Sequence, residues 1–194
     1  MVDASNFDNT ALGIALAALP YEVLSTAEID TLTYMREEEK LAHDVYAQSA
    51  ALWGNWTPIF SNILISEATH TEAVRQLLER YALTDPAATS APGIFQNTAL
   101  QLLYTQLVTA SAPSLIDALS VGAAIEELDM VDINNALVNV DNQDIRLVYE
   151  NLLKGSRNHL RSFVSTLLAQ GVTYEPQTMS PADYNAIVTT AIER

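Results

Sequence analysis

The sequence contains no cysteine and only three histidines, His43, His70 and His159. Without cysteine there can be no disulfide, no thiolate metal site and no cysteine nucleophile. The composition therefore gives no indication of the redox compartment in which the protein works. Any chemistry that depends on imidazole groups must be confined to one small site.

Basic residues are also scarce, with 9 Lys+Arg against 24 Asp+Glu and a formal net charge of -15. Nucleic acids and anionic membrane surfaces are bound through basic faces, so neither is expected as a partner. No apolar run approaches the roughly 18 residues that a membrane span needs. The acidic balance is compatible with cation binding, although most of these carboxylates are expected to be solvated.

The N-terminal residues Met1-Val2-Asp3-Ala4 lack the basic n-region of an intact secretory signal. We therefore expect a soluble protein, either cytoplasmic or exported with its signal removed. At 194 residues and 49% hydrophobic composition, the chain fits one domain with small additions. Residues 1–24 are expected to form a leading segment, whose apolar part ends at Pro20 and packs on that domain.

Helix signals dominate and strand signals are scarce, which predicts an all-α protein. Ser25 and Glu28 have the spacing of a capping box, and Gly171 marks the end of a later helix. Further start signals occur at Thr57-Pro58, Ser114 and Ser180-Pro181. Four long helices are predicted at about 25–51, 57–81, 114–137 and 141–170, with shorter ones at about 97–109 and 180–194.

The long helices form two hairpins separated by a connection of about 82–113, which contains a short helix. This is the pattern of a four-helix bundle with one crossover connection. We expect the bundle to span residues 25–176 and a short C-terminal helix to occupy 177–194.

Polar residues interrupt the apolar stripe of the second long helix. Phe60, Ile63, Glu67, His70 and Val74 follow one another at helical spacing and share one face. An unpaired buried charge costs several kcal/mol, so Glu67 and His70 need a partner in the core. A metal ion is one such partner.

The other long helices place acids or histidine at the same level of their apolar stripes. Two-metal bundles use one Glu from each of two helices and a Glu-x-x-His motif from each of the other two. Here the second motif is incomplete, because Ser156 stands three residues before the histidine of the fourth helix. The candidate metal ligands are Glu39, Glu67, His70, Glu126, Asp129 and His159.

Two of these candidates have alternatives. Asp129 lies one turn beyond Glu126 and could replace the carboxylate missing at Ser156, or it could accept a hydrogen bond from a ligand histidine. Glu127 could take the role of Glu126 if the helix is rotated.

Several further residues are expected beside the ligands or away from them. Tyr46 and Tyr149 share the ligand stripes, where they either pack in the core or serve as hydrogen-bonding, radical or proton-relay groups. Ser156 is expected to fill the gap beside the metals. Residues 37–38 are expected to be solvated or to lie beside the ligands, and His43 is expected on the surface.

These motifs resemble a known superfamily. Glu39 with Ala42 and Tyr46 resembles the first-helix pattern of the rubrerythrin-like branch of the ferritin-like superfamily, and 67–70 resembles its second-helix motif. Glu126 and Asp129 resemble its paired third-helix acids, with Asp where Glu is usual. Segments 38–46, 125–129 and 155–160 more closely resemble an uncharacterised ferritin-like family of prokaryotes. The likeness covers about 25–176.

The resemblance implies a carboxylate-bridged centre of two metal ions, with iron expected and Mn or Zn as alternatives. Such centres oxidise Fe(II), reduce peroxide or activate O₂, so a di-iron oxidoreductase of ferroxidase or peroxidase type is the leading hypothesis. Ferritin-like bundles often form dimers, which makes a homodimer an expectation. One alternative is a metal-binding or structural bundle without turnover, and another is a degenerate bundle that binds a partner through its surface.

Overall fold

The computed structural model describes residues 8–193, and over this range the chain is all-helical, with seven helices and no strand. Residues 1–7, which include the start examined for a secretory signal, and residue 194 lie outside the described residues. The helices are α1 (Asn9–Ala18), α2 (Thr26–Trp53), α3 (Ile59–Arg80), α4 (Thr98–Ser111), α5 (Leu115–Leu137), α6 (Gln143–Ala169) and α7 (Pro181–Val188).

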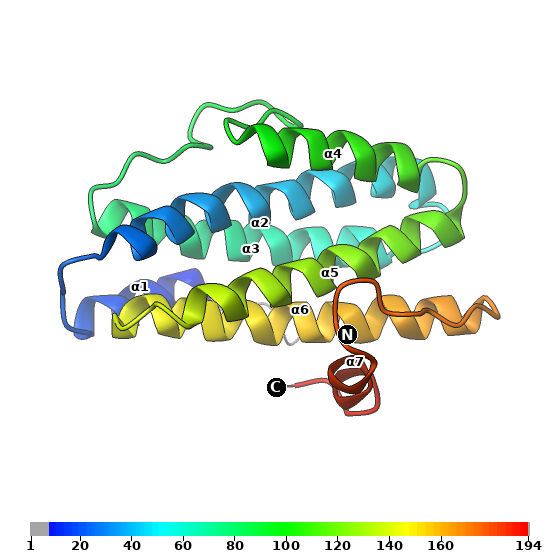
Figure 1. Ribbon diagram of the computed structural model, residues 1–194. Coiled ribbons are helices and arrows are strands. Elements are labelled where there is room, and N and C mark those ends of the chain that lie inside the picture. The colour runs from blue at the N-terminus through cyan, green and yellow to red at the C-terminus, as the bar shows by residue number, and fades with distance from the viewer. Residues whose placement is uncertain (1–7, 194) are drawn as a thin grey trace.

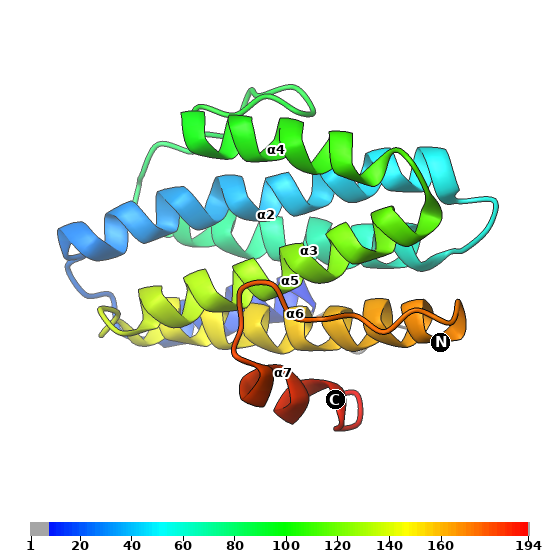
Figure 2. The same cartoon turned by 45° about the vertical axis from the view of Figure 1, so that its right-hand side comes forward.

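The four long helices α2, α3, α5 and α6 lie side by side (Figure 1). α2 packs on α3 and on α5, while α6 packs on the same two helices from the other side. Residues 54–58 join α2 to α3, and 138–142 join α5 to α6, so each hairpin is antiparallel. Figure 2 shows α4 outside this group, where it contacts α2 and α5.

Three of the predicted start signals, at Ser25, Ser114 and Ser180, are side-chain caps in the structure. The Ser25 hydroxyl accepts a hydrogen bond from Glu28 N at 3.2 Å, and the Glu28 carboxylate accepts one from Ser25 N at 2.9 Å. Glu28 also accepts from Asn142 N at 3.2 Å, which ties the start of α2 to the turn before α6. The signal at Thr57-Pro58 is not used as predicted: α3 begins at Ile59, and its N-cap is Pro58, which has no side-chain cap hydrogen bond.

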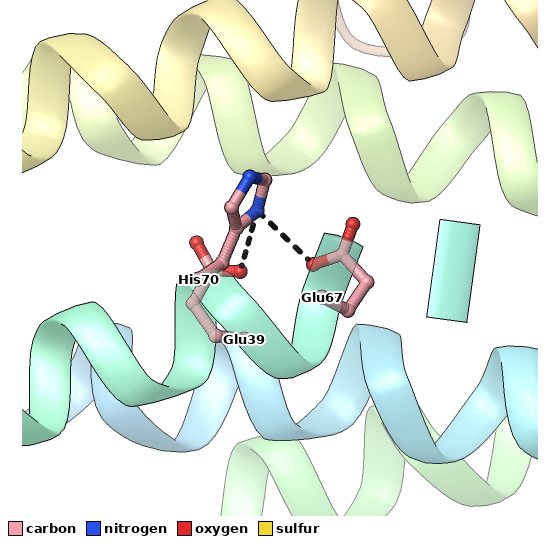
Figure 3. A group of neighbouring side chains, drawn as sticks. All are labelled: Glu39, Glu67 and His70. Carbon is pink, nitrogen blue, oxygen red and sulfur yellow. Dashed lines mark ion pairs between the residues drawn. The ribbon is translucent and has the colours of Figure 1, made fainter. Parts of the chain in front are cut away.

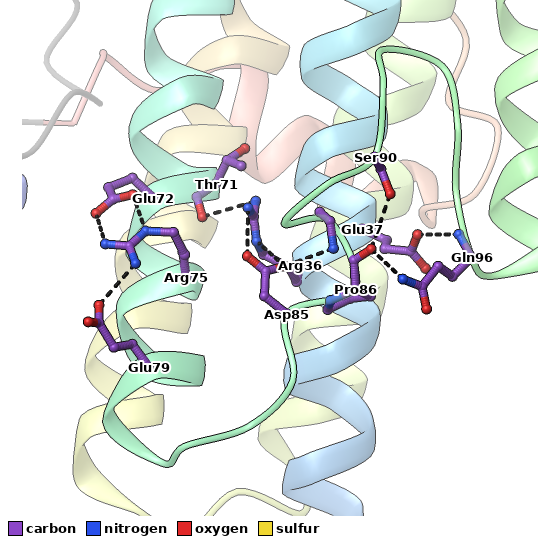
Figure 4. Close-up of polar contacts among 11 residues, drawn as sticks. Arg36, Glu37, Thr71, Glu72, Arg75, Glu79, Asp85, Pro86, Ser90 and Gln96 are labelled. Carbon is purple, nitrogen blue, oxygen red and sulfur yellow. Dashed lines mark hydrogen bonds and ion pairs between the residues drawn. The ribbon is translucent and has the colours of Figure 1, made fainter.

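The connection between α3 and α4 is fixed to α2 by polar contacts (Figure 4). The Arg36 guanidinium donates to both carboxylate oxygens of Asp85, at 3.0 and 3.1 Å. Glu37 accepts from the backbone N–H groups of Gln96 at 2.5 Å and Asn97 at 2.8 Å. The expectation that Glu37 is solvated is therefore wrong, because the connection covers it.

Both terminal segments pack on the long helices. α1 buries Leu12 and Leu16 and contacts α3, and α7 contacts α6. None of the helices in the described range is long and apolar enough to cross a membrane.

The centre of the core has close contact between α5 and α6. Gly122 on α5 faces the buried ring of Phe163, and a Cβ atom at position 122 would overlap that ring. Phe163 also packs against Tyr46 and Phe60, with ring centroids 5.5 and 5.9 Å apart. Its ring therefore has little room to move away.

We expect Gly122→Ala to destabilise the protein by about 1–2 kcal/mol. Overpacking a core costs about 1–3 kcal/mol, and the higher helix propensity of alanine offsets up to about 1 kcal/mol of that. Urea denaturation of both proteins measures the difference. Gly13→Ala is the matched control, because Gly13 faces only the end of the Gln76 side chain. A Gly122→Ala protein as stable as the wild type would contradict this account of the packing.

Candidate metal centre

Five of the six predicted ligands meet at the middle of the four long helices. α2 supplies one, α3 two, α5 one and α6 one, and each is at most 2% exposed. Apolar stripes bury these faces, so the polar side chains are carried inward with their apolar neighbours. The residues are Glu39, Glu67, His70, Glu126 and His159.

Glu67 lies between the two histidines. One of its carboxylate oxygens is 3.4 Å from His70 Nδ1, and the other is 2.9 Å from His159 Nδ1. The two imidazole rings are stacked with centroids 5.5 Å apart. A single carboxylate thus connects α3 to α6 through both imidazoles.

Besides Glu67, each histidine has one further carboxylate next to its Nδ1 atom. A carboxylate oxygen of Glu39 lies 3.4 Å from His70 Nδ1, and one of Glu126 lies 3.4 Å from His159 Nδ1. Figure 3 shows the ion pairs of His70 with Glu39 and Glu67. Two triads result, and they share Glu67.

The donor atoms of each triad are close enough to hold a cation. In each triad they all lie within 4.8 Å of one another. Carboxylate oxygens together with imidazole nitrogens are the ligands that iron, manganese and zinc take in proteins. Each triad therefore offers a donor set that fits such an ion.

Asp129, the sixth predicted ligand, belongs to neither triad. It is buried and accepts a hydrogen bond from the Ser156 hydroxyl, and its other oxygen has no hydrogen-bond partner among the described residues. The structure thus places Asp129 against the position where the second motif lacks its glutamate.

Tyr46 and Tyr149, the two tyrosines predicted beside the ligands, differ in their hydrogen bonding. The Tyr46 hydroxyl donates to the Glu126 carboxylate at 2.6 Å and so orients a member of the second triad. Tyr149 is fully buried. Burial raises the pKa of Tyr149, and the carboxylates of Glu38 and Glu39 add to that rise.

The charges of the cluster shift its pKa values in opposite directions. Burial raises the pKa of the Glu67 carboxyl, but the imidazoles of His70 and His159 outweigh it and hold that pKa far below its usual value. Burial raises the pKa of Glu39 well above normal, and it raises the pKa of Asp129 to about 7.

His70 shows the opposite balance. Burial lowers its pKa, but the carboxylates of Glu67 and Glu39 overcome this and raise the pKa to about 10. Protons on the imidazole and on the raised carboxyls thus balance part of the negative charge. A divalent cation bound by the same atoms would displace them.

Glu127 does not take the place of Glu126. It is fully buried, but its carboxylate accepts hydrogen bonds from the Tyr174 hydroxyl at 2.6 Å and from the backbone N–H groups of 177–179. Glu127 therefore holds the C-terminal segment, and the alternative with a rotated helix is wrong.

Glu38 and Asp132 were not among the predicted ligands, although they lie next to the cluster. Glu38 is 5% exposed, and burial followed by the carboxylates of Asp129 and Asp132 raises its pKa well above normal. Glu38 is thus not solvated, and it lies beside the predicted ligands. The position of Asp132 could have been predicted from the sequence, because Glu126, Asp129 and Asp132 follow one another at three-residue spacing on α5.

The remaining histidine lies apart from the cluster. The His43 side chain is 35% exposed and its Nδ1 is 3.1 Å from Asp44. It therefore sits at the edge of the surface, close to where the sequence places it.

A model of an uncharacterised protein domain family, DUF2202, matches residues 28–191. The chain is similar to the uncharacterised protein MJ0754 of Methanocaldococcus jannaschii, with 45% identity over 180 residues that cover 92% of this chain and 96% of that protein. It is also similar in structure to the crystal structure of the hypothetical protein MJ0754 from Methanococcus jannaschii. That comparison gives a TM-score of 0.87 and 45% identity and covers 91% of this chain and 99% of the other.

We expect Glu67→Gln to lower the pKa of His70 from its raised value near 10. Loss of an adjacent opposite charge removes about 1–3 pH units of such a shift. Histidine side-chain NMR titration of the metal-free protein measures it. Glu72→Gln is the control, because Glu72 lies on the same helix but pairs with Arg75 at the surface. A His70 pKa equal in both variants would contradict the central position of Glu67.

Proposed function

The chain belongs to the DUF2202 family of uncharacterised protein domains, and we propose that its buried cluster is a centre for two metal ions. Glu39 and His70 would hold one ion, and Glu126 and His159 would hold the other. Glu67 would contribute to both. The observation that carries the proposal is the position of the Glu67 carboxylate, with one oxygen near each histidine.

Iron is the proposed metal, with manganese or zinc as alternatives, because a site of carboxylates and imidazoles suits all three. Bound iron would supply the electron chemistry for oxidising Fe(II) or for reducing O₂ or peroxide. The leading function is therefore a di-iron oxidoreductase of ferroxidase or peroxidase type.

The chain's own residues would bind the metal ions, orient the ligands and shield the centre from water. The imidazoles and carboxylates carry the ions, while the Tyr46 hydroxyl fixes the orientation of Glu126. Phe60 and Phe163, both fully buried, are part of the apolar packing that keeps bulk water out. Protons that leave the ligands on metal binding must pass to solvent through neighbouring polar groups.

The arrangement of helices supports a ferritin-like bundle. The four long helices pack in two antiparallel hairpins, and the connection between the hairpins contains α4. We propose that residues 25–176 form the bundle, that 1–24 and 177–194 are additions packed on it, and that two copies associate as a homodimer.

One observation favours a second candidate function, a metal-binding bundle without turnover. The position of the second motif's glutamate is occupied by Ser156, and its neighbour Asp129 lies outside both triads. If Asp129 does not compensate, the ions lack a second carboxylate between them. Binding without consumption of O₂ or peroxide would identify this function.

Anaerobic titration with Fe(II) is expected to saturate at about two ions per chain. Glu67→Ala removes an oxygen from both triads and should abolish tight binding of both ions, whereas His70→Ala should weaken one. Metal analysis after desalting measures the stoichiometry. Glu67→Gln serves as a second variant that preserves side-chain shape, and Glu79→Ala, on the exposed face of α3, is the control.

An O₂ or peroxide pulse on the loaded protein then separates the two functions. Consumption of oxidant with a change in optical absorption supports the oxidoreductase, and binding alone supports the second candidate. A protein that binds no metal after reconstitution would refute both.

Asp129→Asn tests whether Asp129 replaces the missing carboxylate. Asparagine can still accept the hydrogen bond from Ser156, but it is a much poorer cation ligand. We expect the affinity for one of the two ions to fall about tenfold or more, by analogy with losses around metal ligands. Ser156→Ala, which removes the hydrogen bond and keeps the carboxylate, should change affinity less. Unchanged binding by Asp129→Asn would show that Asp129 holds no ion.

A further inference from the structure

A cleft of about 750 Å³ opens between α2, α5 and the connection that precedes α4. Its lining includes the acidic residues Asp30, Glu37 and Asp132 and no lysine or arginine. Glu37 is occupied by the backbone of Gln96 and Asn97 and so builds the wall, as Figure 4 shows for Gln96. Asp30 and Asp132 remain to attract a cation.

A row of carboxylates leads from this cleft to the centre along α5. Glu126, Asp129 and Asp132 follow one another at three-residue spacing and so share one side of the helix. Glu126 belongs to the second triad, whereas Asp132 lines the cleft. Asp129 lies between them and is buried.

α2 contributes a matching pair. The Tyr34 hydroxyl in the cleft wall donates to Asp132 at 3.2 Å. Glu38 lies one turn further along α2, next to the proposed ligand Glu39. On α2, Tyr34 therefore lies at the cleft, and Glu38 lies one turn closer to the proposed ligand Glu39.

Glu38 has no evident structural purpose. It is 5% exposed and lies close to Tyr34, Asp132 and Asp129, yet neither of its oxygens makes a hydrogen bond of standard geometry. A buried carboxylate without a firm partner costs free energy. A cation that passes between Glu38 and Asp132 would supply that partner.

The carboxylates at the cleft are more exposed than those next to the proposed ligands. Asp30 is exposed and Asp132 is partly buried, whereas Glu38, Glu39 and Asp129 are all buried. The ligands of the triads are at most 2% exposed, so an ion needs a route to reach them.

We propose that the cleft is the entrance for divalent cations, and that Asp132 and Glu38 form a transfer site that passes each ion to Asp129 and Glu39. This inference rests on the proposed metal centre and adds its route of loading. The transfer site binds cations transiently, so its loss slows loading and leaves the final occupancy unchanged.

Stopped-flow uptake of Co(II), read by optical absorption, tests the route. Asp132→Asn keeps an acceptor for the Tyr34 hydroxyl and removes the charge. We expect uptake about tenfold slower, within the range that local charge contributes to association rates, with the same number of ions bound at equilibrium. Asp132→Glu should restore most of the rate, and Glu38→Gln should slow uptake as well.

Glu150→Gln is the matched control, since it removes one charge from an exposed residue of α6. If Asp132→Asn takes up Co(II) at the wild-type rate, the route is overturned and the metal centre is left intact. The same conclusion follows if Asp132→Asn and Glu150→Gln slow uptake equally. A lower final occupancy in Asp132→Asn would make Asp132 a ligand and also overturn it. Absence of Co(II) uptake by the wild type would overturn the route and the metal centre together.

Discussion

The carboxylate of Glu67 between the imidazoles of His70 and His159 is the interaction on which the core depends. A carboxylate buried in an apolar interior is stable only with charged or hydrogen-bonding partners on its oxygens. Glu67 obtains one partner from its own helix and one from α6, at 3.4 and 2.9 Å. The separation of α3 and α6 is therefore set by ion pairing as well as by side-chain packing. The absence of a side chain at Gly122 allows α5 to approach Phe163 on α6 at the same time.

Several arginines hold connecting or terminal segments onto the long helices. Arg36 holds the connection through Asp85, Arg80 pairs with Asp144 at the start of α6, and Arg157 pairs with Glu193. The ion pairs that Glu39, Glu67 and Glu126 make within the described residues are all with histidine. In an acidic protein the scarce fixed cations thus secure segments that lack helical packing of their own. The centre is left to histidines, protons and the proposed metal ions for its charge balance.

The sequence predicts the features that depend on local chemistry. The capping box at Ser25 and the positive φ of Gly171 mark helix ends because the required groups lie within a few residues. Helical spacing likewise brings Glu67 and His70 to one face. Burial of Glu37 and Glu127 could not be predicted, because irregular segments without periodicity cover them. The choice between Glu126 and Glu127 depends on helix rotation, which only the packed neighbours determine.

The two triads differ in their tolerance of local unfolding, because Glu67 shares one hairpin with the other members of the first triad but not with those of the second. Glu39, Glu67 and His70 all belong to the α2–α3 hairpin, so one triad remains whole if the two hairpins part. The other triad combines Glu67 with Glu126 and His159, and it exists only while the hairpins are docked. Sub-global opening along the hairpin interface would therefore dismantle one half-site and spare the other. Release of a proposed ion from the second triad would in this way depend on the docking equilibrium of the hairpins, whereas release from the first would depend on the stability of a single hairpin.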